Sequence, residues 1–218
     1  MFTGIINQVI PIVSIKESTD KKIFSIRLKE INEAILLGES IAINGVCQTV
    51  SAIKGNEISF YTMQQTLADT NINNLQQSDM VNVEFSLTPA SKISGHFVTG
   101  HVDCLGKIIK VEKKNDATGF HIDFPDNFSN LIVKKGSIAV NGISLTVSNV
   151  INSSFTFMAI PQTMMTTTLQ YTKEADMLNL EFDILAKYLN ANKGHDTKTD
   201  KDSSKITLDL LRQKGFIS

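Results

Sequence analysis

An internal repeat constrains this chain of 218 residues more than any other feature of its sequence. Residues 40–51 read SIAINGVCQTVS and residues 137–148 read SIAVNGISLTVS, so eight of twelve positions are identical at a spacing of 97. Average composition produces about one match in fifteen, so chance is a poor explanation. The same spacing relates DMVNVEF at 79–85 to DMLNLEF at 176–182, and Thr3-Gly4 recurs as Thr99-Gly100 at a spacing of 96. A period of this length is the size of a small domain, which predicts two copies of one domain.

We expect the copies to span residues 1–96 and 97–186, followed by a C-terminal segment at 187–218. Within each copy, short runs such as 23–28 and 81–85 alternate apolar and polar residues, as half-buried strands do. Asn44-Gly45 and Asn141-Gly142 are strong turn dipeptides. The pattern predicts an all-β fold with a closed antiparallel barrel of five or six strands in each copy. Short helices are expected at 30–37 and 65–73 and at their equivalents.

The C-terminal segment has a different pattern. Residues 184–189 begin an amphipathic helix, and the polar stretch 190–205 is expected to be a linker. A last helix is predicted to begin at Ser203 or Ser204 and to end at Gly215. A helix this short needs a surface to pack on, either in its own chain or in a neighbouring subunit.

Composition excludes several classes of function. The formal charge is 21 − 22 = −1, which lacks the basic footprint of a nucleic-acid binder. No apolar run approaches the ~18–20 residues of a membrane helix, and the N-terminus does not resemble a secretory signal. Cys47 and Cys104 are the two cysteines. We therefore expect a cytoplasmic protein with free thiols.

Each copy places a row of small polar residues beside its Asn-Gly turn. Ser144, Thr146 and Ser148 share one face of the strand after Asn141-Gly142, and Cys47 and Thr49 occupy matching positions in the first copy. Such a row can line a pocket for a neutral ligand with many hydrogen-bonding groups. The alternative is an ordinary solvated strand face.

The segment from His96 to Cys104 is the densest in functional groups. His101 is interpreted as a general base or ligand donor, with a polar residue on the barrel rim as the alternative. Zinc binding is a weaker interpretation, because no second pair of ligands stands elsewhere. The first copy has Ile5 in place of His101 and Ser86 in place of Asp183, so the two pockets are chemically unequal. Asp183 is either a group that acts on a ligand or a helix N-cap.

Four motifs in order resemble the alpha-type riboflavin synthases: MFTGII at 1–6, NGVCQTV at 44–50, GHFVTGHVD at 95–103 and GISLTV at 142–147. The resemblance covers residues 1 to about 189. It implies two six-stranded Greek-key barrels that each bind one lumazine, and a homotrimer held by C-terminal helices. The implied reaction is the dismutation of two 6,7-dimethyl-8-ribityllumazine molecules into riboflavin and 5-amino-6-ribitylaminouracil. No metal or redox cofactor is implied.

The resemblance also implies the site residues. In the first barrel, the implied substrate-binding residues are Gly4, Ile5, Ile6, Cys47, Gln48, Thr49, Tyr61, Thr62, Met63, Gln64, Gln65 and Thr66. In the second barrel, they are Gly100, His101, Val102, Lys135, Ser144, Leu145, Thr146, Met158, Ala159, Ile160, Pro161, Gln162 and Thr163. The implied catalytic residues are Phe2, Cys47, His101, Ser144, Thr146 and Asp183. The family often has an aspartate where this chain has Asn141.

Two unequal pockets suit a reaction in which two identical substrates take opposite roles. One substrate needs a methyl proton removed and the other needs a nucleophile added to its ring. We expect His101 or a bound water to remove the proton, and Ser144 or Cys47 to assist the addition. A non-catalytic lumazine- or flavin-binding protein of the same fold is the main alternative. A flavin-dependent reductase is less consistent, because the chain has no Gly-x-Gly-x-x-Gly motif.

Overall fold

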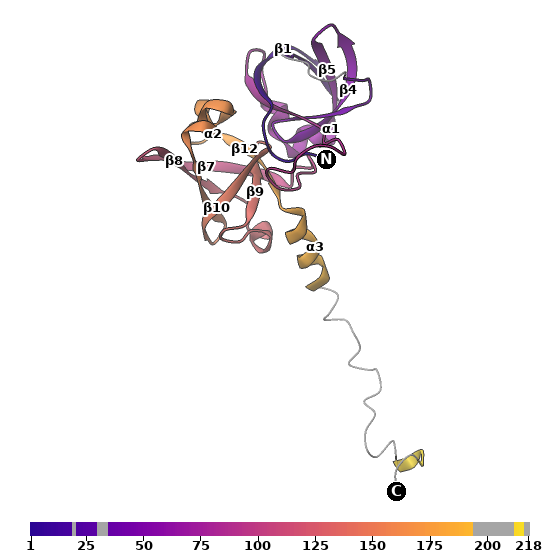
Figure 1. Ribbon diagram of the computed structural model, residues 1–218, viewed down its shortest axis with the longest axis vertical. Coiled ribbons are helices and arrows are strands. Elements are labelled where there is room, and N and C mark those ends of the chain that lie inside the picture. Colours follow the sequence, from indigo (N-terminus) through magenta and orange to yellow (C-terminus); the bar gives the residue numbers. More distant parts are fainter. Residues whose placement is uncertain (19–20, 30–34, 194–211, 216–218) are drawn as a thin grey trace.

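Two β-barrels of equal design make up most of the protein. A computed structural model describes residues 1–18, 21–29, 35–193 and 212–215. Figure 1 shows the two barrels in contact, the N-terminus where they meet, and a helix leading away from the second barrel. Among the described residues, no helix is long and apolar enough to cross a membrane.

The first barrel closes six antiparallel strands in the order β1-β2-β5-β4-β3-β6. Its strands are β1 (Gln8–Ser18), β2 (Lys21–Arg27), β3 (Ser40–Ile43), β4 (Val46–Lys54), β5 (Glu57–Met63) and β6 (Met80–Phe85). The helix α1 (Gln64–Asp69) and the 3-10 helix η1 (Asn71–Asn74) connect β5 to β6. This arrangement confirms the helical prediction at 65–73.

The second barrel repeats this design. Its strands are β7 (Cys104–Lys114), β8 (Ala117–Asp123), β9 (Ser137–Val140), β10 (Ile143–Ile151), β11 (Ser154–Ala159) and β12 (Met177–Phe182). The short helices are η2 (Asp126–Leu131), α2 (Pro161–Thr166) and η3 (Thr168–Tyr171). The closed order β10-β11-β8-β7-β12-β9 matches that of the first barrel when each strand is replaced by its equivalent in the other repeat. The predicted all-β fold of two six-stranded barrels is therefore confirmed.

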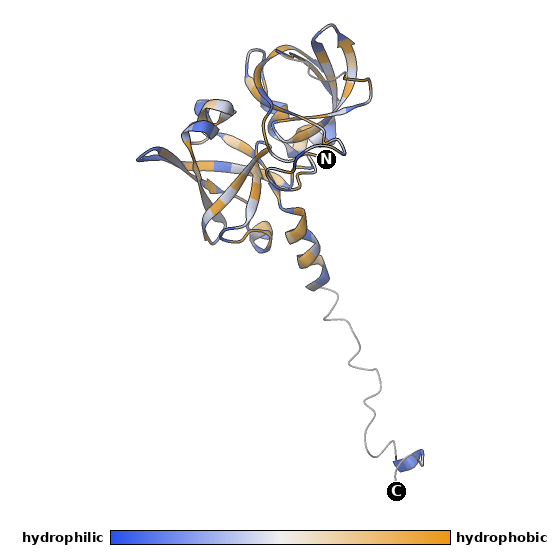
Figure 2. Cartoon of the chain, in the orientation of Figure 1, coloured by the Kyte–Doolittle hydropathy of each residue, from blue (hydrophilic) through white to orange (hydrophobic). Residues whose placement is uncertain are grey.

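Alternating side chains fill each barrel, as the banded strands in Figure 2 show. Phe24 and Phe60 pack with ring centroids 5.3 Å apart in the first barrel. Their repeat equivalents Phe120 and Phe157 stack at 5.0 Å in the second. Cys104 belongs to the second core, whereas Cys47 is partly exposed, and both thiols are free. Burial raises the pKa of the Cys104 thiol to about 12.

The C-terminal prediction needs correction at one boundary. The helix α3 (Ile184–Lys193) confirms the amphipathic helix, but it continues through residues 190–193, which were expected to be linker. The helix propensity of Ala191 and Lys193 sustains the final turn. The predicted start at Ser203 or Ser204 lies outside the described residues. Residues 35–37 of the helix expected at 30–37 are not helical, and residues 30–34 lie outside the described part.

The two barrels meet around matching turns that are related by a local two-fold axis. A Cβ atom built on Gly45 would lie 2.5 Å from Gly142 N, and one built on Gly142 would lie 2.7 Å from Gly45 N. Asn82 Nδ2 donates to Asn141 O at 2.9 Å, and Asn179 Nδ2 donates reciprocally to Asn44 O at 2.8 Å. The contact is therefore polar, close and symmetric.

We expect Gly45→Ala to lower the free energy of unfolding by about 2 kcal/mol or more. The new Cβ would meet Gly142, and φ at Gly45 is +76°, a conformation that costs an L-residue about 1–2 kcal/mol. Gly55→Ala is the matched control: φ is +62°, but no atom lies within 4 Å of the added Cβ. Urea unfolding followed by circular dichroism measures both. Equal losses in the two variants would contradict the close contact.

Candidate active site

The leading segments of the two repeats, residues 2–6 and 98–102, are exchanged between the barrels. Phe2 N donates to Val98 O at 2.7 Å, and Val98 N donates to Phe2 O at 3.0 Å, so the two segments pair in antiparallel fashion. Ile6 then packs against the core of the second barrel, and Val102 packs against the core of the first. Each repeat thus begins on the barrel that the other repeat builds.

This exchange corrects the predicted composition of the two pockets. Gly4 O accepts a hydrogen bond from Ser144 N at 2.8 Å, and Gly100 O accepts one from Cys47 N at 2.8 Å. Gly4–Ile6 therefore lies with the Ser144 strand of the second barrel, and Gly100–Val102 lies with the Cys47 strand of the first. The prediction had them the other way round, because it assumed that each repeat supplies its own pocket.

Glycine is required at both crossings. Gly4 and Gly100 have φ of +76° and +82°, in the left-handed region. A Cβ atom on Gly4 would lie 2.6 Å from Ser144 Cβ, and one on Gly100 would lie 2.7 Å from Cys47 Cβ. Each glycine therefore lets the crossing segment lie directly on the polar row of the opposite barrel.

In the second barrel, Ser144 is paired with a histidine. The Ser144 Oγ lies 2.7 Å from His96 Nδ1. Burial lowers the pKa of His96 below its usual value, and the negative charge of Asp183 opposes part of that shift. The His96 Nε2 atom is buried and has no hydrogen-bond partner among the described residues. A neutral imidazole beside a hydroxyl can accept its proton and activate its oxygen.

The pairing of His96 with Ser144 is not apparent from the sequence. The position of His96 in GHFVTGH placed it near the site, but 48 residues separate it from Ser144. Among the described residues, no three His, Cys, Asp or Glu side chains gather as a metal site requires. Asp103 instead accepts a hydrogen bond from Phe182 N at 2.8 Å and pairs with Lys187 at 2.7 Å.

In the first barrel, Cys47 and His101 replace the serine and the isoleucine of the second. Cys47 is partly exposed beside Gly100, and His101 is exposed. His101 precedes β7 and is not in a strand. Gln48 is buried, and its Oε1 accepts a hydrogen bond from Thr62 Oγ1 at 2.6 Å. Gln48 and Thr62 therefore point into the barrel, and Tyr61 and Met63 are exposed on the other face of β5.

Other predicted residues take varied positions. Phe2 is fully buried between the barrels with Ala42, Val98 and Ala139, and Cys47 packs against this cluster. Asp183 Oδ1 accepts a hydrogen bond from Leu185 N at 3.0 Å, as an N-cap of α3 does. Ser144 is half-buried and Thr146 exposed on the outer row of β10, while Leu145 points inward.

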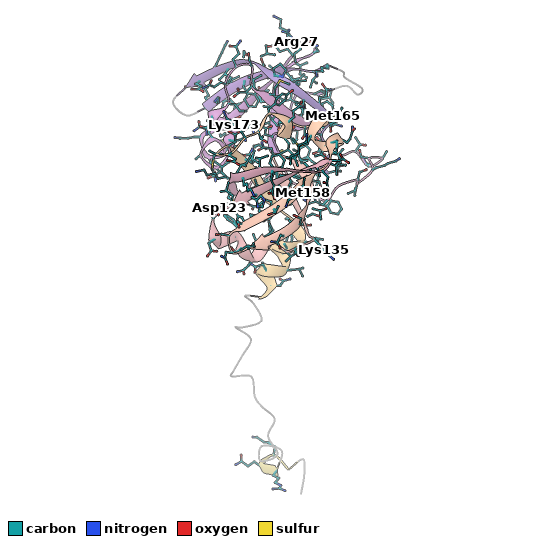
Figure 3. All side chains as sticks on the ribbon, turned by 90° about the vertical axis from the view of Figure 1, so that its left-hand side faces the viewer. Arg27, Asp123, Lys135, Met158, Met165 and Lys173 are labelled. Atoms are coloured by element: carbon teal, nitrogen blue, oxygen red, sulfur yellow. The ribbon has the colours of Figure 1, made fainter. Side chains whose placement is uncertain are left out.

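The remaining second-barrel residues surround the end of β11. Met158 is half-buried, Ala159 is buried, Ile160 is exposed, and Pro161, Gln162 and Thr163 begin α2. Lys135 is exposed at a turn with φ of +68°. Figure 3 shows Lys135 toward the α3 end of the second barrel and Met158 farther from it. Lys135 N donates to Val147 O at 2.8 Å, and Val147 pairs with Phe157, the residue before Met158.

A cavity of about 320 Å³ adjoins the crossing of the first leading segment. Its lining includes Thr3, Ile5, Ser86, Lys92 and Ser94. The volume falls at the lower end of the range for small-molecule sites, about 300–1,000 Å³. Ser144 and His96 are not part of the lining, but Gly95, which follows the lining residue Ser94, is so close that a Cβ atom built on it would lie 2.8 Å from Ser144 Cβ. The cavity thus lies beside the Ser144–His96 pair and does not enclose it.

Comparisons with known proteins agree with this architecture. The family described as Lumazine binding domain matches residues 3–86 and 99–183. LumP complexed with riboflavin has a similar fold, with a TM-score of 0.78, 22% identity, and coverage of 84% of this chain and 99% of that chain. LumP complexed with 6,7-dimethyl-8-(1'-D-ribityl) lumazine gives a TM-score of 0.75, 22% identity, and coverage of 83% and 98%.

Full-length relatives are more similar in sequence. Riboflavin synthase of Actinobacillus pleuropneumoniae is 34% identical over 216 residues, covering 99% of this chain and all of the relative. Riboflavin synthase of Bacillus subtilis (strain 168) is 33% identical over 218 residues, with 99% and 100% coverage. That of Escherichia coli (strain K12) is 34% identical over 186 residues, with 84% and 87% coverage. The chain therefore belongs to the riboflavin synthase family, and its two barrels are lumazine binding domains.

Proposed function

We propose that each barrel binds one 6,7-dimethyl-8-ribityllumazine, and that a four-carbon unit passes from one molecule to the other. The products are riboflavin and 5-amino-6-ribitylaminouracil. Together they contain all atoms of the two substrates, so the transfer requires no external oxidant or reductant. The observation that carries this proposal is the pair of repeat-related side-chain clusters with unequal groups: Ser144, His96 and Ile5 in one, Cys47 and His101 in the other.

The Ser144–His96 pair suits the substrate that undergoes addition to its ring. His96 is neutral at pH 7 because burial lowers its pKa, so it can accept the proton of Ser144 or of a water held by Ser144. The activated oxygen then adds to the electron-poor ring, and the negative charge spreads into the heterocycle. Asp183, whose negative charge acts on His96, favours the protonated imidazole that results.

The first barrel suits the substrate that loses a methyl proton. His101 is exposed and follows Gly100, which lies against Cys47. An imidazole at this position can accept the methyl proton as the carbanion is delocalised into the ring. Holding the two rings in register supplies up to ~7–11 kcal/mol of the barrier reduction. The alternative of a non-catalytic binding protein is less well supported, because the full-length relative at 34% identity is a synthase, whereas the LumP structures are 22% identical.

We further propose that the working form is a homotrimer. Leu185, Tyr188 and Leu189 on α3 are each more than 60% exposed, an apolar face that one chain leaves uncovered. Lys187 on the same helix is held by Asp103, which fixes that face outward. Both pockets are also open to solvent in one chain, since Ile5, Tyr61 and Ile160 are exposed. A neighbouring chain that packs on α3 can bring a first-barrel pocket against a second-barrel pocket.

The direct test is incubation of the purified protein with 6,7-dimethyl-8-ribityllumazine and no other cofactor. We expect riboflavin to accumulate at one molecule for every two lumazines consumed, together with one 5-amino-6-ribitylaminouracil. Fluorescence and chromatography measure both products. A stable lumazine complex without turnover would contradict the synthase assignment and support a binding protein.

We expect Ser144→Ala and His96→Gln each to lower kcat by about 10²–10⁴-fold, the usual size of acid–base assistance. The wild-type rate is expected to hold at neutral pH and to fall only below about pH 6.5, because the pKa of His96 is lowered and its neutral form is the active one. His96→Gln removes that acidic limb. His121→Gln is the control, because His121 pairs with Glu112 on the surface. Full activity of His96→Gln would contradict the role of His96 as the base that activates Ser144 or a bound water.

We expect Tyr188→Glu to reduce the oligomer to monomer at micromolar concentration, because it places a charge on the exposed apolar face of α3. Asn190→Glu changes an exposed polar residue of the same helix and is expected to leave the assembly intact. Light scattering coupled to size-exclusion chromatography reports the mass. A wild-type monomer, or a trimer in Tyr188→Glu, would argue against α3 as the interface.

A further inference from the structure

We propose that Glu84 and Glu181 are positioning residues that act across the barrel boundary, so that each controls the ligand pocket of the barrel to which it does not belong. Glu84 is in the first barrel and orients Ile5 at the second-barrel pocket. Glu181 is in the second barrel and orients His101 at the first-barrel pocket. This inference rests on the proposed lumazine sites, and it assigns to both glutamates a role that acts through the segments they hold.

Each carboxylate accepts hydrogen bonds from the backbone and the threonine side chain of a leading segment. Glu84 Oε1 accepts hydrogen bonds from Thr3 N at 2.7 Å and Thr3 Oγ1 at 2.9 Å, and Glu84 Oε2 accepts one from Gly4 N at 3.0 Å. Glu181 Oε1 accepts from Thr99 N at 2.6 Å and Thr99 Oγ1 at 2.7 Å, and its Oε2 accepts from Gly100 N at 2.9 Å. Each carboxylate thus holds a Thr-Gly pair by three donors.

Placing a carboxylate at each of these positions has an energetic cost. Glu84 is 4% exposed and Glu181 3% exposed, and burial raises the pKa of both carboxyl groups. The hydrogen bonds from the two segments oppose that rise. A buried carboxylate is costly unless its oxygens are satisfied, whereas an apolar side chain would pack without this penalty. The repeat nevertheless has glutamate in both copies, which fits a role in holding the segments.

The glycine of each leading segment links its glutamate to the pocket. Gly4 O accepts a hydrogen bond from Ser144 N, so the glycine held by Glu84 at its amide is held by the second barrel at its carbonyl. The next residue, Ile5, is therefore fixed beside Ser144. The same relation connects Glu181, Gly100 and Cys47 to His101. In each repeat, the glycine whose amide is bound by the glutamate directly precedes the residue at the pocket.

Because the leading segments are exchanged, each glutamate is expected to affect the pocket of the opposite barrel. A purely local role would disturb the pocket of the barrel that contains the altered glutamate, and a general loss of stability would disturb both pockets alike. Control through the segment predicts the crossed pattern, in which Glu84 affects only the second-barrel pocket and Glu181 only the first.

The chain contains no tryptophan, so a single introduced tryptophan can report on each pocket separately. Tyr61→Trp marks the first-barrel pocket and Ile160→Trp the second, both at exposed positions. Riboflavin is the probe, and quenching of the tryptophan fluorescence gives its Kd at each pocket without turnover. Glu84→Gln and Glu181→Gln, each in both reporter backgrounds, serve as controls for one another because they remove equivalent oxygens from equivalent sites.

We expect Glu84→Gln to raise the Kd about ten-fold in the Ile160→Trp background and to leave the Kd unchanged in the Tyr61→Trp background, with the reverse for Glu181→Gln. Local effects, or equal effects on both pockets, would overturn the proposal. If riboflavin quenches neither reporter in the parent proteins, the pockets themselves are misplaced and the proposed function fails first. Should the glutamine variants not fold, Thr3→Val and Thr99→Val each remove one hydrogen-bond donor to the glutamate, and the same crossed pattern is required.

Discussion

The antiparallel pairing of Phe2 with Val98 is the contact on which the rest of the arrangement depends. Because these two residues lie in the leading segments of the two repeats, their pairing forces each segment to cross to the other barrel. Both side chains are buried with Ala42 and Ala139, and burial of this small apolar cluster stabilises the crossing. A barrel cut from the chain would therefore lack the segment that completes its pocket.

An amide network at the local two-fold axis keeps the crossing in register. Asn141 Oδ1 accepts hydrogen bonds from Asn179 N at 2.8 Å and Asn71 Nδ2 at 3.0 Å, and Asn44 Oδ1 accepts one from Asn82 N at 2.9 Å. In both hydrogen bonds Asn141 Oδ1 acts as the acceptor, and a carboxylate oxygen could accept them equally. Asn141 therefore serves the contact between the barrels through its acceptor oxygen.

The repeat and its alternation were sufficient to predict two six-stranded barrels, because strand period and turn chemistry are local properties. The composition of the pockets could not be predicted in the same way. Gly4 meets Ser144 and Gly100 meets Cys47 across 140 and 53 residues, and sequence order alone favours pairing within each repeat. The His96–Ser144 pair was missed for the same reason. In contrast, the N-cap role of Asp183 was foreseen as one of two interpretations, since capping acts over only two or three residues.

Duplication resolves a conflict between symmetry and chemistry. Two identical substrates need similar pockets, and a two-fold related pair of barrels supplies them from one design. The reaction needs unequal groups, and sequence differences between the repeats supply these outside the two barrel cores: Ile5 and His101 lie outside the strands, and Cys47 and Ser144 lie on the outer row. Substitutions there change the pocket without changing the packing of Phe24, Phe60 and their equivalents. The scaffold can therefore stay symmetric while its two sites take opposite roles.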